Sequence, residues 1–291
     1  SSGLLGSALV PYLTGSGHFV VRLVRNKPDR DRGDIVWDPV SGKIERTRLE
    51  GFDAVVHLAG ENIARRRWSR ARKARILSSR VQGTEFLAQT LAGLQNKPRV
   101  LVSASGIGYY GNRPGHVVRE ETPAGTGFLA ELCQEWERST QIADTAKIRV
   151  VQMRFGIVLS PRGGALRTML GPFRLGLGGP FGSGRQFMSW IAIDDALAAI
   201  LRAIEDDKIR GPVNAVAPQP VTNAEFTRTL GRVLARPALL PAPAFALRLA
   251  LGELADEGLL SSCQAVPGKL SSAGFKFEYP DLEEALRRML S

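Results

Sequence analysis

The sequence predicts an α/β protein with a doubly wound, mostly parallel sheet and a smaller second domain in its C-terminal half. Apolar, β-branched segments at 53–60, 99–105 and 148–160 alternate with segments of helical periodicity. Strands rich in Val, Ile and Leu are typical of parallel sheets that helices cover on both faces. The chain has 291 residues, of which 44% are hydrophobic, and is therefore long enough to bury a large core.

The first elements follow in the order loop, helix, turn and strand. Glycines near the start precede apolar residues at helical spacing, and the β-branched segment 19–25 follows them. A further helix is expected from Gly127 to Ala146. We expect a nucleotide-binding domain over 1–160 and a smaller, loop-rich substrate domain over 161–291. A strand and a helix near 190–206 are expected to return to the first domain.

The second half is less regular. The segment 162–190 is dense in glycine, proline and aromatic residues, which predicts irregular loops over a site. Asp194 or Asp195 is expected to start the helix that follows. Thr222 and Glu225 have the spacing of a capping box, which predicts another helix start.

The formal net charge of +11 is concentrated between residues 65 and 80. The basic residues of this segment, which contains no acid, are Arg65, Arg66, Arg67, Arg70, Arg72, Lys73, Arg75 and Arg80. The apolar stripe that overlaps them consists of Leu77, Val81, Thr84, Ala88 and Leu91. This stripe predicts a packed helix whose basic side chains are solvated. Trp68 is the only aromatic residue of the basic segment, so we expect no nucleic-acid partner and favour an anionic cofactor or substrate.

The composition favours a cytoplasmic protein. No apolar stretch is long enough and free enough of charge to predict a membrane span. The two cysteines, Cys133 and Cys263, fit a reducing compartment. Cys133 lies on an apolar helical stripe, where a buried, inert thiol is expected. The sequence predicts no metal site and leaves a homodimer open.

Gly3 and Gly6 have the spacing of the last two glycines in the phosphate-binding turn of a Rossmann fold. In that fold the turn follows the first strand, and the next helix directs its N-terminus at the pyrophosphate. We therefore expect a strand's length of apolar residues ahead of Ser1. The strand that follows the helix ends in Arg25, which suits the 2′-phosphate of NADP better than the ribose of NAD. The alternative is that Arg25 is only a solvated residue at a strand end.

Motifs along the whole chain resemble the extended short-chain dehydrogenase/reductase superfamily. They are "SSGLLG", "VVHLAGENI", "RVLVSASGIGYYG", "VVQMRFGIVLS" and "SWIAIDD". More narrowly, "RRRWSRARKARILSSRV" and the closing "VPGKLSSAGFKFEYPDLEEAL" resemble the epimerase-like YfcH subgroup with its C-terminal domain of unknown function. The resemblance implies NADP(H) as the cofactor. It implies that the residues contacting the cofactor are Gly3, Leu4, Leu5 and Gly6 at the pyrophosphate, Arg25 at the 2′-phosphate, Leu58, Ala59 and Gly60 at the adenosine and ribose, and Ser103 at the nicotinamide ribose.

The catalytic pattern departs from this superfamily. Its enzymes use a tyrosine and a lysine four residues apart on one helix, whereas the matching helix offers Phe128 and Leu132 or Leu129 and Cys133. The conventional mechanism therefore cannot be assigned. Ser105 remains a candidate for polarising a carbonyl, and Tyr109 or Tyr110 for supplying a proton. The alternative is that both tyrosines are only aromatic walls of a pocket.

Further residues are candidates for a substrate pocket. They are Glu61, Asn62, Tyr110, Arg185, Gln186 and Trp190. Capping would also explain Glu61 and Asn62, and solvation would explain Arg185. His57 lies inside a strand and is expected to be a buried histidine rather than a base.

The sequence thus predicts an NADP(H)-dependent oxidoreductase or epimerase-like enzyme of atypical mechanism on a small polar substrate. The alternative is a non-catalytic NADP(H)-binding sensor or regulatory protein. The missing tyrosine and lysine favour the alternative, and the segment that would cover the pocket favours the enzyme.

Overall fold

A four-stranded parallel sheet forms the centre of the computed structural model, which describes residues 2–25, 28–29, 31, 33–64 and 67–291. Its strands, in spatial order, are β11 (Gly211–Ala215), β7 (Arg149–Phe155), β5 (Val100–Gly106) and β4 (Ala54–His57). Ser105 of β5 pairs with Arg154 of β7, and Ser103 pairs with His57 of β4. The predicted mostly parallel α/β sheet is confirmed, and β11 is an edge strand that the sequence did not indicate.

A second, smaller sheet lies beside the first. It contains β1 (Leu23–Val24), β2 (Ile35–Asp38) and β3 (Lys43–Ile44), with β1 and β2 parallel and β2 and β3 antiparallel. Only two residues of the expected strand over 19–25 pair with another strand. Within the described residues, no strand joins β1 to β4. The expectation of an additional apolar strand ahead of Ser1 stays a prediction.

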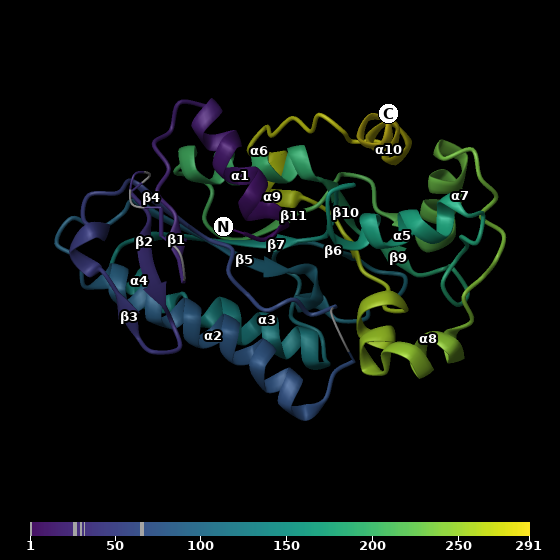
Figure 1. Cartoon of the computed structure of the whole chain (residues 1–291), viewed down its shortest axis with the longest axis horizontal. Helices are drawn as coiled ribbons and strands as arrows, with labels where there is room; N and C mark the ends of the chain where they lie inside the picture. Colours follow the sequence, from purple (N-terminus) through teal and green to yellow (C-terminus); the bar gives the residue numbers. More distant parts are fainter. Residues whose placement is uncertain (1, 26–27, 30, 32, 65–66) are drawn as a thin grey trace.

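Helices cover both faces of the central sheet (Figure 1). One face carries α1 (Leu4–Gly15) and α6 (Ile193–Glu205), and the other carries α2 (Arg70–Ala92), α3 (Phe128–Arg138) and α4 (Gln141–Thr145). Alternate residues of β5 face the two layers, because side chains alternate along a strand. Val102 packs in the core with α1 and α6, whereas Leu101 packs with α2 and α4.

The apolar face of α2 differs from the predicted stripe at its N-terminal end. Thr84, Ala88 and Leu91 are buried as predicted, but Leu77 is 36% exposed, and Ile76 is buried in its place. Counting back one helical turn from Ile76 leads to Arg72, whose side chain is only 8% exposed. The expectation that the basic side chains are all solvated is therefore wrong for Arg72. Arg65 and Arg66 lie outside the described residues.

Two predicted elements are each divided into two. The apolar segment 148–160 forms β7 and then β8 (Ile157–Leu159), which pairs with β10 (Trp190–Ala192). Between them, a Cβ on Gly156 would lie 2.6 Å from the carbonyl oxygen of Ser189, so only glycine fits where the segments meet. The expected helix from Gly127 to Ala146 is broken between α3 and α4. There the Ser139 and Thr140 hydroxyls donate to the carbonyls of Trp136 and Glu137.

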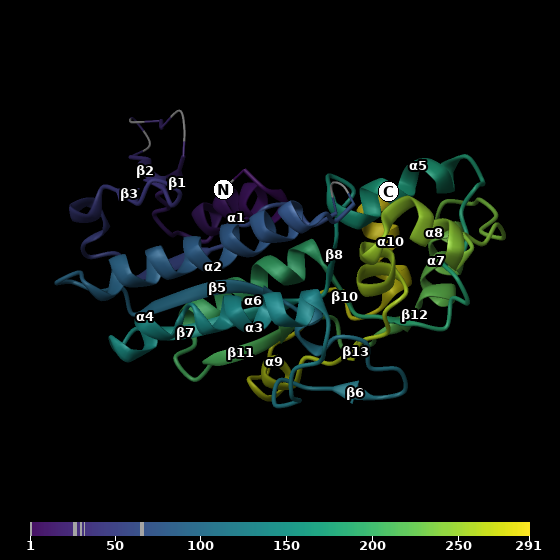
Figure 2. The same ribbon diagram turned by 90° about the horizontal axis from the view of Figure 1, so that it is seen from below.

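The C-terminal half builds a second core at one end of the sheet (Figure 2). Its helices are α5 (Gly164–Arg174), α7 (Asn223–Val233) and α10 (Leu282–Leu290). The expectation of loops alone over 162–190 is wrong, because Leu166, Leu170 and Phe173 bury one face of α5. The capping prediction is confirmed, since the Thr222 hydroxyl accepts a hydrogen bond from the Glu225 amide.

Short elements complete the chain. They are η1 (Arg46–Leu49), η2 (Ile107–Tyr110), β6 (Val117–Val118), β9 (Phe187–Met188), β12 (Val221–Thr222), α8 (Ala244–Leu251), η3 (Ala255–Leu259), β13 (Gln264–Ala265) and α9 (Gly268–Ser272). The pair β9 and β12 is antiparallel, and β6 and β13 are parallel. In the described part of the chain, no helix combines the length and apolar character of a membrane span.

His57 ends β4 inside the protein. Its side chain packs edge-on against Trp37, and its Nε2 atom has no hydrogen-bond partner among the described residues. Burial lowers the pKa of His57 to about 4. As expected from the sequence, it is a buried histidine, and it is uncharged at neutral pH.

We predict that His57 makes the fold sensitive to mild acid. Between pH 6.5 and pH 4 the unfolded chain binds a proton that the folded protein excludes, so stability falls as the pH falls. From pH 7 to pH 5 this site should remove about 2 kcal/mol from the free energy of unfolding. Urea unfolding of H57F should show a smaller loss over that interval, whereas H116Q, at an exposed histidine, should resemble the parent. Equal losses in H57F and the parent would contradict the assignment.

Candidate functional site

The N-terminus of α1 presents backbone amides that no described side chain caps. Gly3 precedes the helix in an extended conformation, no side chain caps it, and the first turn contains no acid. A Cβ on Gly3 would meet no atom within 4 Å. The first amides of the helix have no partner within it and favour an anion. Gly6 is buried, and the side chains of Leu4 and Leu5 pack against the core shared with α6.

The other predicted cofactor residues differ in accessibility. Arg25 is exposed directly after β1, and no described residue pairs with its guanidinium; the neighbouring Lys27 lies outside the described residues. Leu58 and Ala59 are half-buried after β4, and Gly60 is exposed. Ser103 needs correction: it is fully buried within β5, and its hydroxyl donates to the carbonyl of Ala104 at 3.4 Å. It does not present a group to a bound ribose.

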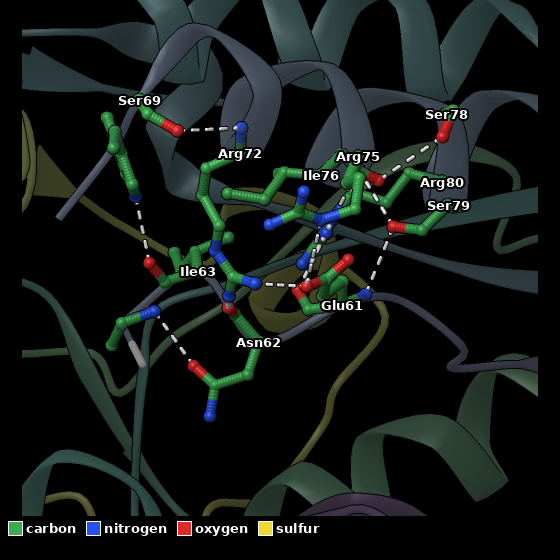
Figure 3. A network of polar contacts seen from close by, with 12 residues as sticks. Glu61, Asn62, Ile63, Ser69, Arg72, Arg75, Ile76, Ser78, Ser79 and Arg80 are labelled. Carbon is green, nitrogen blue, oxygen red and sulfur yellow. Dashed lines mark hydrogen bonds and ion pairs between the residues drawn. The ribbon is translucent and has the colours of Figure 1, made fainter. Parts of the chain in front are cut away.

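The loop after β4 is held by α2 (Figure 3). The Glu61 amide donates to the Ser79 hydroxyl at 3.1 Å, and Arg80 donates to the Glu61 carbonyl at 2.9 Å. Arg72 forms an ion pair with the Glu61 carboxylate and donates to the Asn62 carbonyl. The Nε atom of Arg75 lies 3.9 Å from the same carboxylate. Glu61 is therefore bound by its backbone and by its side chain.

Asn62 acts locally. Its Oδ1 atom accepts a hydrogen bond from the Ala64 amide at 2.8 Å, while the residue itself is exposed. This is the capping arrangement that the sequence left open. The Trp68 indole donates to the Ile63 carbonyl at 2.9 Å and fixes the far side of the same turn.

A buried ion pair lies behind the ends of β5 and β7. Arg154 donates from Nε and Nη2 to the two carboxylate oxygens of Glu137, each at 2.7 Å. Burial alone lowers the pKa of Arg154, but the Glu137 carboxylate outweighs it and raises that pKa. The Ser105 hydroxyl donates to Glu137 at 2.7 Å. In this arrangement Ser105 presents no free donor to a carbonyl, so its predicted role needs correction.

The two tyrosines after β5 have different environments. Tyr110 is fully buried; its hydroxyl donates to Asn214 at 2.7 Å and accepts from Arg154 at 2.9 Å. Burial raises the pKa of Tyr110 to about 12. Its assignment to the substrate pocket is therefore wrong. Tyr109 is half-buried, its ring centroid lies 3.5 Å from the Arg154 guanidinium carbon, and its hydroxyl has no partner in the described chain.

Leu129 and Cys133 of α3 face the end of β5. A Cβ on Gly108 would lie 3.1 Å from that of Leu129, and a Cβ on Gly106 would lie 3.9 Å from the Cys133 sulfur. Burial raises the pKa of the Cys133 thiol to about 11, as expected of an inert cysteine. One turn further along α3, Glu137 is the acid that reaches the end of β5, and it is already bound to Ser105 and Arg154.

The sequence did not indicate how α3 begins. Its first two amides, of Phe128 and Leu129, donate to the carboxylate of Glu257 at 2.8 and 2.7 Å. Lys73 of α2 forms an ion pair with Glu253 of the same C-terminal segment. The charged residues of 253–257 thus connect the second half of the chain to the helices beside the site. In the sequence, the only sign of these contacts is that the acidic residues of 253–257 follow a strongly apolar segment.

The three candidates from the segment 162–190 do not gather around a pocket. Trp190 is fully buried in the second core, and its indole donates to the Gln219 carbonyl at 3.1 Å. The Gln186 amide donates to the carbonyls of Phe181 and Leu259, each at 3.0 Å. These two assignments are corrected to structural roles. Arg185 is exposed.

Comparisons with known proteins match the chain along most of its length. A model of the NAD dependent epimerase/dehydratase family matches residues 1–215, and a model of a domain of unknown function (DUF1731) matches residues 242–289. The chain is 48% identical to the epimerase family protein Mb2239 of Mycobacterium bovis over 286 residues, which cover 98% of this chain and 94% of that protein.

More distant relatives are similar over the same extent. The epimerase family protein YfhF of Bacillus subtilis is 35% identical over 293 residues, covering all of this chain and 96% of that protein. The crystal structure of the human epimerase family protein SDR39U1 with NADPH has a TM-score of 0.91 and 35% identity, covering 99% of this chain and 96% of that one. These matches confirm the resemblance that the sequence motifs indicate.

We predict that Glu137 is needed to keep Arg154 buried. E137Q should lower the free energy of unfolding by about 3 kcal/mol, because it leaves a buried guanidinium without a counter-charge. The matched control is E135Q on the same helix, where Glu135 pairs with the exposed Arg138. This change should cost less than about 1 kcal/mol. Similar losses in denaturant unfolding of the two variants would contradict the prediction.

Proposed function

Because the chain belongs to the NAD dependent epimerase/dehydratase family, we propose that it is an NADP(H)-dependent oxidoreductase or epimerase-like enzyme acting on a small polar substrate. The observation that carries the proposal is the N-terminus of α1, which no side chain caps. Arg25 adds to it, because it is exposed at the end of the next strand and no described residue pairs with it. The relative crystallised with NADPH supports the choice of cofactor.

The residues present fit this cofactor. The amides at Leu4 and Leu5 and the open surface above Gly3 suit a pyrophosphate, which carries two negative charges and needs close backbone approach. Arg25 suits a 2′-phosphate, since a guanidinium donates to two of its oxygens at once. The segment from Leu58 to Gly60 leaves β4 at the edge of the sheet where this fold binds ligands. The cofactor would supply hydride transfer.

Proton exchange is assigned to Tyr109. It is the accessible tyrosine at the end of β5, its hydroxyl is uncommitted within the described chain, and Arg154 holds its ring from one face. Ser105 acts on Tyr109 indirectly, because its hydrogen bond to Glu137 orients the ion pair between Glu137 and Arg154, whose guanidinium supports the Tyr109 ring. Tyr109 is therefore the candidate catalytic residue, and Ser105 is a positioning residue.

A second candidate function is a non-catalytic NADP(H)-binding sensor. The observation that favours it is the apolar face of α3, where Leu129 and the inert Cys133 approach the strand end. A protein of this kind would bind the cofactor without consuming it, and cofactor binding would alter its association with another protein. A broad panel of carbonyl compounds, monitored for NADPH oxidation, separates the two functions.

We predict that Arg25 selects NADPH over NADH. R25A should weaken NADPH binding by about tenfold to a hundredfold and leave NADH binding unchanged, because only NADPH carries the 2′-phosphate. Fluorescence titration of both nucleotides measures this. The control is R99A, which removes an exposed arginine at the opposite end of the strands. If the parent binds the two nucleotides equally, the assignment of Arg25 fails.

We further predict that Tyr109 affects turnover and not cofactor binding. With any carbonyl compound that the parent reduces, Y109F should lower kcat by about a hundredfold or more, the usual contribution of a positioned acid. NADPH affinity should stay within twofold of the parent. Unchanged turnover in Y109F would remove Tyr109 from the mechanism, and an inactive parent across the panel would favour the sensor.

A further inference from the structure

Three arginines of α2 surround Glu61, two of them at its carboxylate and the third at its backbone carbonyl. We call Arg72, Arg75 and Arg80 the arginine cluster; Figure 3 shows them around Glu61 at the start of the loop after β4. Among the described residues, Glu61 is the only acid within ion-pair distance of any of the three. The arginine cluster and Glu61 together therefore carry a net charge of +2.

Arg72 has a donor without a partner. Its side chain is more than nine-tenths buried, and its two terminal nitrogens bind the Glu61 carboxylate and the Asn62 carbonyl. The Nε atom is buried and has no acceptor in the described chain. A buried donor without an acceptor is costly, so its persistence here points to an acceptor that the described residues do not supply.

Arg80 has hydrogen bonds, but no described acid lies within ion-pair distance of it. Its Nη1 atom donates to the carbonyls of Glu61 and Ile76, and its guanidinium lies 4.9 Å from the ring centroid of Trp136. Carbonyls and a ring face are neutral partners. Burial lowers the pKa of Arg80, which reflects the cost of holding its charge away from water. An anion beside this residue would offset that cost.

The arginine cluster adjoins the proposed cofactor site. A Cβ on Gly60 would lie 3.0 Å from the Arg80 guanidinium, and Gly60 is the last residue of the segment expected to line the cofactor. Arg75 is 60% exposed, which leaves the cluster accessible from solvent. A molecule that reacts at the ends of β4 and β5 could therefore extend to these arginines.

We propose that the arginine cluster binds a dianionic group of the substrate, with Glu61 as an internal competitor for the same guanidinium groups. That the bound molecule is a substrate rests on the proposed function, whereas the binding of a dianion by the arginine cluster does not. A dianion would balance the two uncompensated charges and would compete with the Glu61 carboxylate for the donors of Arg72 and Arg75. Two chemistries supply such a group, a phosphoryl ester and a dicarboxylate, and both share oxyanion acceptors for planar guanidinium forks.

Binding of simple probes tests the site directly. Equilibrium dialysis of the full chain with radiolabelled phosphate and, separately, with radiolabelled succinate measures the affinity of each. R75Q should weaken binding of the preferred probe about tenfold, the loss of one charge-assisted contact. E61Q should tighten it severalfold, because the competing carboxylate is gone. The matched control is R70Q, an exposed arginine on the same helix outside the cluster, which should change the affinity less than twofold.

The outcomes separate this inference from the proposed function. If R75Q and R70Q weaken probe binding equally, the probe is attracted by net charge alone, and the inference is overturned. Weaker probe binding in E61Q would also overturn the inference. Saturating NADPH should leave probe binding intact; if NADPH displaces the probe, the cluster holds a cofactor phosphate and the inference fails while NADPH binding stands. If NADPH does not bind at all, the proposed function fails, and the probe result still decides the site.

Discussion

The bond between Arg154 and Glu137 is the constraint around which the carboxyl edge of the sheet is arranged. It ties β7 to α3, and the Ser105 hydroxyl extends it to β5. Through Tyr110 it reaches Asn214 of β11, so three strands and one helix are fixed relative to one another. A buried ion pair adds little stability over an apolar substitute, but it accepts only one geometry. The pair therefore positions Tyr109 rather than simply stabilising the core.

The strands and helices that could be predicted are those whose burial follows one period. The strands at 100–106 and 149–155 are buried on both faces, and continuous apolar runs indicate this reliably. The prediction failed where tertiary contacts override local pattern. Gly156 ends β7 because the chain near Ser189 crosses there, and α5 forms in a glycine-rich segment because three apolar side chains find a second core. Neither partner is visible from the local sequence.

The residues of the candidate site also differ in whether local sequence or tertiary contacts determine their surroundings. The helix start after Gly3 could be predicted because a glycine turn and the apolar spacing that follows it lie within one short segment, whereas its contact with a cofactor stays a prediction. The roles of Ser105, Tyr110 and Trp190 could not, because their partners lie tens of residues away in the sequence. Arg72 illustrates the limit most clearly: its charge suggests a solvated face, whereas the turn of α2 buries it beside Glu61. Only the three-dimensional arrangement distinguishes these two environments.

The cap of α3 has a consequence for the order in which the chain acquires its structure during synthesis. Phe128 donates to Glu257, which leaves the ribosome 129 residues later. At translation rates of roughly 5 to 20 residues per second, the amides that open α3 wait several seconds for their acceptor. The sheet and the body of α3 have their local partners by then, whereas the turn that carries Leu129 gains its cap only after Glu257 has been synthesised. The end of the chain thus finishes a helix that begins near its middle.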